Sequence, residues 1–177
     1  MILRSLPLLV ALILSGCERD EALLVEPTRW VEADADADPF ADRPDTIDCS
    51  PLSWSVENLA APSLEIDSTS CDYLALTQPM VEDVRVGEEV EVRLWHNDLI
   101  APEAAVTHVA VAFDGVTLWE VRLDIPVGQG REAALVLDTF EATEEIPVDT
   151  EVIFHLHNHG QNSYNLVHVK RLGRDSE

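Results

Sequence analysis

The sequence predicts an all-β protein, an antiparallel β-sandwich of about seven or eight strands. From about Cys49 to Leu172, apolar and polar residues alternate in short runs, a period typical of strands with one buried face. Turn-forming residues separate these runs, and no segment sustains the period of a helix. Immunoglobulin-like and cupredoxin-like sandwiches fit this pattern. A jelly roll also fits, because periodicity predicts strands and not their order.

The chain begins with a segment that has the layout of an export signal. In MILRSLPLLVALILSGC, Arg4 precedes an apolar run over residues 6–14, and small residues follow before Cys17. The run is too short to cross a bilayer as a permanent helix. Its last four residues, LSGC, resemble the lipobox of bacterial lipoproteins. The resemblance implies a signal peptide over residues 1–16 and acylation of Cys17.

The same resemblance implies an address in the cell envelope. Several acyl chains on Cys17 would hold the protein stably at a membrane. In lipoproteins of double-membraned bacteria, an aspartate after the cysteine causes retention in the inner membrane, whereas residue 18 here is glutamate. The resemblance therefore implies an outer-membrane lipoprotein.

Residues 17–48 are predicted to be a lipidated cysteine followed by an acidic, disordered tether. The segment contains an Asp-Ala repeat, many acidic residues and no sustained period, so it offers little apolar surface to bury. Asp34, Asp36 and Asp38 could be read as a calcium loop, but the glycine and terminal glutamate of an EF-hand are missing. The prediction is a solvated spacer before a domain at 49–172, with a tail at 173–177.

Two cysteines remain after the lipidation site, Cys49 and Cys71. In an oxidising, exported setting they most simply form a disulfide. A bridge of this loop length stabilises a fold by roughly 3 kcal/mol. The alternative is a pair of free thiols that bind metal.

Charge and motifs exclude several functions. The 34 acidic residues against 11 basic ones give a formal charge of −23, which argues against nucleic-acid binding and against docking on anionic lipid. Such a surface attracts cations or basic partners. The sequence has no G-x-S-x-G, phosphate-loop or H-E-x-x-H motif. We therefore expect a binding module rather than an enzyme.

The clearest hairpin joins residues 108–113 to residues 116–125 through an Asp-Gly turn. Counting back from this turn places His108 opposite Val121, on the apolar face of the hairpin. In the strand at 89–96, the alternation puts His96 on the apolar face and Trp95 on the polar face. Further strands are expected at residues 52–56, 71–78, 133–140, 150–157 and 164–172.

The strand at 150–157 carries the most specific chemical signal. His155, His157 and His159 occupy alternate positions, and the first two lie opposite the apolar set of that strand. Side chains two apart on a strand are close enough to converge on one metal ion. The H-x-H pair also faintly resembles the copper-binding strands of multicopper oxidases. The alternative is surface histidines without a ligand.

The remaining side chains restrict the metal. With the two cysteines paired and Met80 the one methionine after the signal, a blue-copper or Cu(I) site is disfavoured, and Zn(II) or Cu(II) is favoured. His96 or His108 would complete the site if the fold brings them near His155.

A second hypothesis uses the aromatic residues. Trp95 and Tyr164, together with Asn162 in the loop directly before Tyr164, could form a platform for a sugar or a peptide. The third hypothesis is a purely structural envelope lipoprotein with no ligand.

Overall fold

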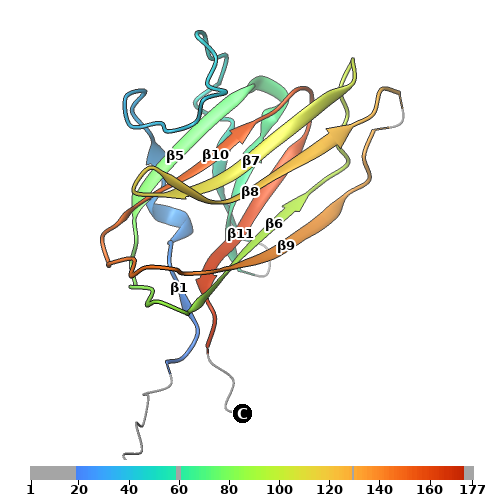
Figure 1. Cartoon of the computed structure of the whole chain (residues 1–177). Coiled ribbons are helices and arrows are strands. Elements are labelled where there is room, and N and C mark those ends of the chain that lie inside the picture. The colour runs from blue at the N-terminus through green and yellow to red at the C-terminus, as the bar shows by residue number, and fades with distance from the viewer. Residues whose placement is uncertain (1–18, 59–60, 129, 174–177) are drawn as a thin grey trace, which may run out of the picture.

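The computed structural model describes residues 19–58, 61–128 and 130–173. The predicted signal peptide, the lipidation site Cys17 and residues 174–177 therefore lie outside the described residues. Within the described ranges, eleven strands form two antiparallel sheets that pack face to face, as Figure 1 shows. The predicted β-sandwich is confirmed.

The strands differ in length, from two to ten residues. They are β1 (Ala22–Leu23), β2 (Val31–Glu32), β3 (Trp54–Asn58), β4 (Pro62–Asp67), β5 (Tyr73–Pro79), β6 (Glu89–His96), β7 (Ala105–Phe113), β8 (Val116–Ile125), β9 (Ala134–Glu141), β10 (Glu151–His157) and β11 (Ser163–Arg171), with short 3-10 helices η1 (Pro27–Arg29) and η2 (Ser68–Ser70). Within the described residues, no helix has the length and apolar character that a bilayer crossing requires.

The strand order is that of a jelly roll. One sheet runs β3-β4-β11-β6-β9, with β1 also beside β11, and the other runs β2-β5-β10-β7-β8. From β4 to β11, every connection crosses between the sheets except the β7-β8 hairpin. Two interlocked Greek keys of this kind define the jelly roll, one of the three topologies compatible with the sequence pattern.

The inner faces of the sheets form the main core. In β6, Val90, Val92 and Leu94 are fully buried together with His96, as the alternation predicts. Phe154 and its apolar neighbours on β10 face them from the other sheet. The histidines of β10 therefore lie on the outer face of their sheet, as predicted.

The predicted strands correspond closely to observed ones, and β6 and β8 have the predicted bounds. The prediction missed β4. In that strand Leu64 and Ile66 are fully buried and alternate with Ser63, Glu65 and Asp67, so the alternation is present but short.

The predicted position of His108 is wrong by one residue. Phe113 pairs with Val116 as expected, but the register shifts between Val111 and Ala112, so His108 pairs with Arg122 instead of Val121. The bulge is an extra residue in one strand of the pair. Because of it, the side chains of β7 up to Val111 lie on the face opposite to the predicted one. His108 therefore points outward, to the same face as His155.

The predicted disordered tether is also wrong for residues 19–48. Leu24, Val25 and Trp30 are buried in the main core, and Phe40 is buried on the outer face of the β10 sheet. β1 pairs with β11 and β2 pairs with β5. Net charge predicted disorder, but Leu24, Val25, Trp30 and Phe40 are buried against the sandwich, and their burial offsets the cost of ordering.

Candidate metal centre

A segment without strands, residues 33–48, crosses the outer face of the β2-β5-β10-β7-β8 sheet, and we call it the strap. At its start, the Ala33 amide donates to the Ala75 carbonyl of β5 at 2.9 Å. At its end, the Cys49–Cys71 disulfide ties the chain to the residues before β5. The bridge confirms the predicted pairing and rules out these cysteines as thiolate ligands.

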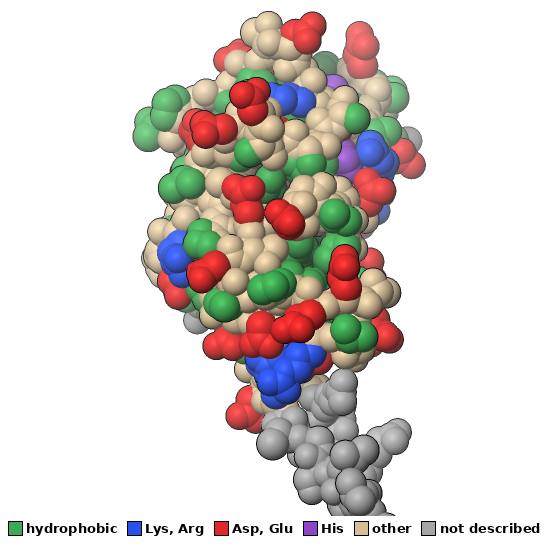
Figure 2. Space-filling model, turned by 60° about the vertical axis from the view of Figure 1, so that its left-hand side comes forward, with side chains coloured by type: hydrophobic (Ala, Val, Ile, Leu, Met, Phe, Trp, Pro, Cys, Tyr) green, Lys and Arg blue, Asp and Glu red, His purple; other side chains and the backbone are tan. Residues whose placement is uncertain are grey.

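The strap makes a second, smaller core on the outer face. Phe40 packs there with side chains from β5, β7 and β10, namely Tyr73, Ala75, Ala110, Ala112 and Ile153. His155 lies among them and is fully buried, although its strand face would be solvent-exposed without the strap. On the face in Figure 2, histidine is visible only as small patches near one edge.

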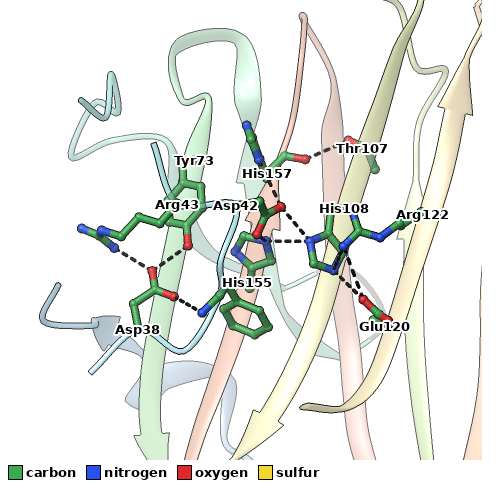
Figure 3. Close-up of polar contacts among 11 residues, drawn as sticks. Asp38, Asp42, Arg43, Tyr73, Thr107, His108, Glu120, Arg122, His155 and His157 are labelled. Atoms are coloured by element: carbon green, nitrogen blue, oxygen red, sulfur yellow. Dashed lines mark hydrogen bonds and ion pairs between the residues drawn. The ribbon is translucent and has the colours of Figure 1, made fainter. Parts of the chain in front are cut away.

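Asp42 of the strap brings three histidines together (Figure 3). Its Oδ2 lies 2.8 Å from Nδ1 of His108 and 3.2 Å from Nδ1 of His157. Its Oδ1 lies 3.4 Å from Nε2 of His155. The same His155 nitrogen lies 3.2 Å from Nδ1 of His108.

These distances match the edges of a coordination tetrahedron. Ligand atoms placed 2.0 to 2.1 Å from a Zn(II) ion at tetrahedral angles are about 3.3 to 3.4 Å apart. Oδ2 of Asp42 lies 2.8 Å from Nδ1 of His108, and the other oxygen, Oδ1, lies 3.4 Å from Nε2 of His155; the two ring nitrogens are 3.2 Å apart. A small rotation of the carboxylate, or coordination by both of its oxygens, would therefore place ligand atoms of all three residues around one ion, with His157 beside them.

Metal binding requires particular protonation states of His108 and His155. A carboxylate can only accept, so Nδ1 of His108 donates to Asp42 here, and this nitrogen becomes a ligand when an ion displaces its proton and Nε2 donates to Glu120. Nε2 of His155 is a ligand in the tautomer that carries its proton on Nδ1. Burial lowers the pKa of His155 to about 4, so the ring stays neutral near pH 7.

The Asp42 carboxylate is ionised despite partial burial. Burial alone would raise its pKa, but hydrogen bonds from His108 and His157, and the interaction with His155, together hold the pKa well below its usual value. The cluster thus combines a negative oxygen ligand with neutral imidazole nitrogen. This is a donor set that suits Zn(II) and Cu(II).

A second layer of residues orients the cluster. Nε2 of His108 lies 2.9 Å from Oε2 of Glu120, the carboxylate contact that commonly supports a metal-bound histidine. The ring of Phe40 stacks on His155 with centroids 4.2 Å apart. The buried Asp38 carboxylate accepts hydrogen bonds from Tyr73 and Arg43, both at 2.6 Å, which fastens the strap.

The structure unites some of the predicted ligands and separates others. His108, His155 and His157 meet at Asp42. The ring of His159 lies 4.8 Å from that of His157, but His159 lines a cavity of about 590 Å³ at the end of the sandwich. His96 is wrong as a ligand, because it is buried on the inner face of the other sheet, with Nδ1 2.8 Å from the Asn97 carbonyl oxygen.

Sequence reasoning missed Asp42 and Glu120. Asp42 was assigned to a disordered tether, and its neighbours in sequence give no periodic signal. Glu120 was hidden by the β7-β8 bulge, since the unshifted register turns its partner His108 toward the apolar face.

The predicted aromatic platform is wrong. Tyr164 is fully buried, and its hydroxyl group lies 2.8 Å from both the Thr107 hydroxyl and the Asn158 side-chain oxygen. Asn162 is also buried and donates to Asn158. Trp95 is 40% exposed, but it lies on the opposite face of the sheet from Tyr164.

Comparisons with known proteins yield similarities in structure only. No family model matches the sequence, and no curated protein matches it. Among solved structures, a carbohydrate-binding module with specific mannan recognition matches with a TM-score of 0.49 and 9% identity, over 90% of this chain and 98% of that one. A family 11 carbohydrate-binding module from Clostridium thermocellum, in complex with a β-1,3-1,4-mixed-linked tetrasaccharide, has a TM-score of 0.46 and 10% identity, over 92% and 100%.

Larger proteins also contain a similar part. An arabinose-bound α-L-arabinofuranosidase matches with a TM-score of 0.45 and 12% identity, over 89% of this chain. This chain corresponds to 27% of that enzyme. All of these TM-scores lie below 0.5, so none of the similarities carries an argument for what this chain binds.

Proposed function

We propose that this protein binds one Zn(II) or Cu(II) ion through Asp42, His108, His155 and His157. The observation that carries the proposal is the convergence of Asp42, His108 and His155, whose nearest ligand atoms lie 2.8 to 3.4 Å apart, with Nδ1 of His157 also 3.2 Å from the Asp42 carboxylate. This group contains no methionine thioether and no free thiolate, which favours these two ions.

The contacts inside the cluster favour a cation at its centre. In the tautomer of His155 that leaves Nε2 bare, Nε2 and Oδ1 of Asp42 are two acceptors that oppose each other at 3.4 Å in a largely buried setting. A cation between them converts this repulsion into two bonds. The excess of acidic residues over the whole chain also favours approach of a cation.

We propose binding rather than catalysis as the role. A catalytic ion needs an open coordination position beside a cavity that admits a substrate. The cavity of about 590 Å³ is lined by His159 and by none of the three clustered histidines. Phe40 of the strap and Tyr73 of β5 both pack against His155 and further cover the cluster.

Calorimetric titration of purified, metal-free protein with each ion tests the proposal. We expect one saturable site in the wild type and its loss in the His155→Ala, His157→Ala double variant. His168→Ala is the matched control, because His168 lies on β11 and contacts Glu91 rather than the cluster. Equal binding by the wild type and the double variant would refute the site.

The protein is further proposed to reside at the cell envelope as a lipoprotein anchored through Cys17, most simply in the outer membrane. The support is the LSGC motif after an apolar run. Metabolic labelling with palmitate should mark the wild type and leave Cys17→Ser unmarked. Labelling of both proteins, or of neither, would overturn the anchor.

A glycan is the second candidate ligand, favoured by the outer face of the β6 sheet. There the exposed ring of Trp95 pairs across strands with Leu135 on one side and Asn165 on the other. An exposed indole can stack on the apolar face of a sugar ring, while amide and carboxylate groups bond its hydroxyls. Glu57 contacts Asn165 at 2.9 Å and supplies such a carboxylate.

Affinity electrophoresis in gels that contain soluble β-glucan or mannan tests this candidate. Retardation of the wild type that is lost in Trp95→Ala, but kept in Val116→Ala on the other sheet, would support it. Mobility unaffected by both polysaccharides would remove these glycans as ligands.

A further inference from the structure

We infer that the Cys49–Cys71 disulfide positions Asp42, so that the metal site reaches full affinity only in the oxidised protein. This inference rests on the proposed metal site and adds a condition for its assembly. It concerns the strap, because the strap carries a ligand that the sheet itself does not supply.

The three histidines are placed by the sheet alone. β10 and β7 are paired neighbours, with His157 opposite His108 and His155 opposite Ala110. Their positions follow from the strand register, which the strap does not determine. Asp42 belongs to no strand, and its carboxylate reaches β7 and β10 only if the strap lies across the sheet.

The two ends of the strap are held differently. Its start follows β2, whose two residues pair with Thr77 and Leu76 of β5. Its end is held by the disulfide and by amide hydrogen bonds between residues 48–50 and 70–72, including those that link Asp48 and Asp72. Asp48 and Asp72 are exposed, and hydrogen bonds in contact with water contribute little net free energy.

Without the bridge, the C-terminal end of the strap can separate from the sheet. The bridge links Cys49, directly after the strap, to Cys71, two residues before β5, so without it that end is held only by the amide hydrogen bonds. Phe40 and Asp38 would still contact the sheet, so the strap would sample attached and detached states. Asp42 would be in place for a fraction of the time, which lowers the apparent affinity by that fraction.

The redox step is a two-electron exchange. Oxidation joins the two sulfur atoms and transfers two electrons and two protons to a disulfide oxidant, which becomes a dithiol. A dithiol reductant reverses the reaction. In an exported protein the bridge would form after transport, so the complete site would form in that compartment and not before.

A double-mutant cycle tests whether the bridge acts through Asp42. We expect Asp42→Asn to weaken Zn(II) binding by about 10-fold or more, and the Cys49→Ser, Cys71→Ser pair to weaken it in the same direction. In the Asp42→Asn background, removal of the bridge should cause little further loss. At saturating Co(II) the bridge-free variant should keep the wild-type visible spectrum, because Asp42 still binds in the attached state, whereas Asp42→Asn should show an altered spectrum.

A second variant avoids the risk that removal of the bridge unfolds the protein. Three glycines inserted after Thr46 lengthen the strap and leave the disulfide intact. We expect this insertion to weaken Zn(II) binding as well, with an unchanged far-ultraviolet circular dichroism spectrum. His168→Ala again serves as the variant that leaves binding unchanged.

The outcomes separate this inference from the proposed function. If wild-type protein binds no Zn(II) or Cu(II), the metal site itself is refuted. If wild-type protein binds and the bridge-free protein binds equally well, the positioning role is refuted and the site stands. Full, additive losses from Asp42→Asn and from bridge removal would also refute it, because the bridge would then act independently of Asp42.

Discussion

Nε2 of His155 lies 3.2 Å from Nδ1 of His108, although the two residues are on different strands and 47 positions apart in the chain. They are diagonal neighbours across the β10-β7 pair, since His155 is opposite Ala110. The β7-β8 bulge accompanies this arrangement, and it places Glu120 behind His108. Two ligands and their outer partner thus come from one sheet, and Asp42 closes the group from outside.

Glu120→Gln should weaken metal binding by about 10- to 100-fold, because the carboxylate that orients His108 is replaced by a neutral amide. Calorimetric titration with Zn(II) measures the change. Asp124→Asn, an exposed change on the same strand, is the matched control. Equal affinities for Glu120→Gln and the control would show that this contact does not support a metal ligand.

Metal should raise the thermal stability of the wild type. An ion present at 100 times its dissociation constant stabilises the folded state by about 2.7 kcal/mol. For a domain of this size, that corresponds to a rise in Tm of roughly 5 to 10 °C. Differential scanning calorimetry with and without Zn(II) measures it. Asp42→Asn should lose most of the rise, and a full rise in that variant would contradict the assignment of Asp42 as a ligand.

The strands were predictable, because alternation of apolar and polar residues is a local signal that the sandwich respects. Val90, Val92, Leu94 and His96 illustrate it, since all four are buried as the period requires. The outward direction of His155 and His157 was also predictable from their own strand.

The segment that covers the outer face of the β10 sheet, where His155 and His157 lie, was not predictable in the same way. A strap without period contributes Asp42 and Phe40 through contacts that no local pattern encodes. The predicted face of His108 was wrong for a related reason. The bulge changes the register of this hairpin, and no residue type in the sequence indicates where the bulge lies. Sequence periodicity therefore located two ligands, and long-range packing determined the others.

Phe40→Ala should lower the free energy of unfolding by about 3 kcal/mol, because it removes a buried ring that stacks on His155 and fills the smaller core. Urea denaturation followed by circular dichroism measures the loss. Val31→Ala, a change of an exposed residue in the same N-terminal region, should alter stability by less than about 0.5 kcal/mol. Equal effects of the two changes would mean that the strap does not pack stably on the sheet.

The ion pair between Arg19 and Asp83 should make part of the stability dependent on pH. Arg19 donates to both carboxylate oxygens of Asp83, at 2.7 and 2.9 Å. These hydrogen bonds lower the pKa of Asp83 below its usual value of 3.8, with burial acting in the opposite direction. Because the folded state binds this proton more weakly than the unfolded state, Asp83 contributes stability above the unfolded pKa.

That contribution should disappear as the pH falls through the lowered pKa of the folded state. Wild-type protein should therefore be more stable than Asp83→Asn at pH 5 to 7, and the difference should shrink steadily below about pH 4. Urea denaturation of both proteins at several pH values measures it, with the exposed Asp36→Asn as control. A difference that stays constant from pH 7 to pH 2.5 would show that the lost stability comes from packing and not from ionisation of Asp83. Because Asp83 is partly exposed, the difference should also decrease at high salt.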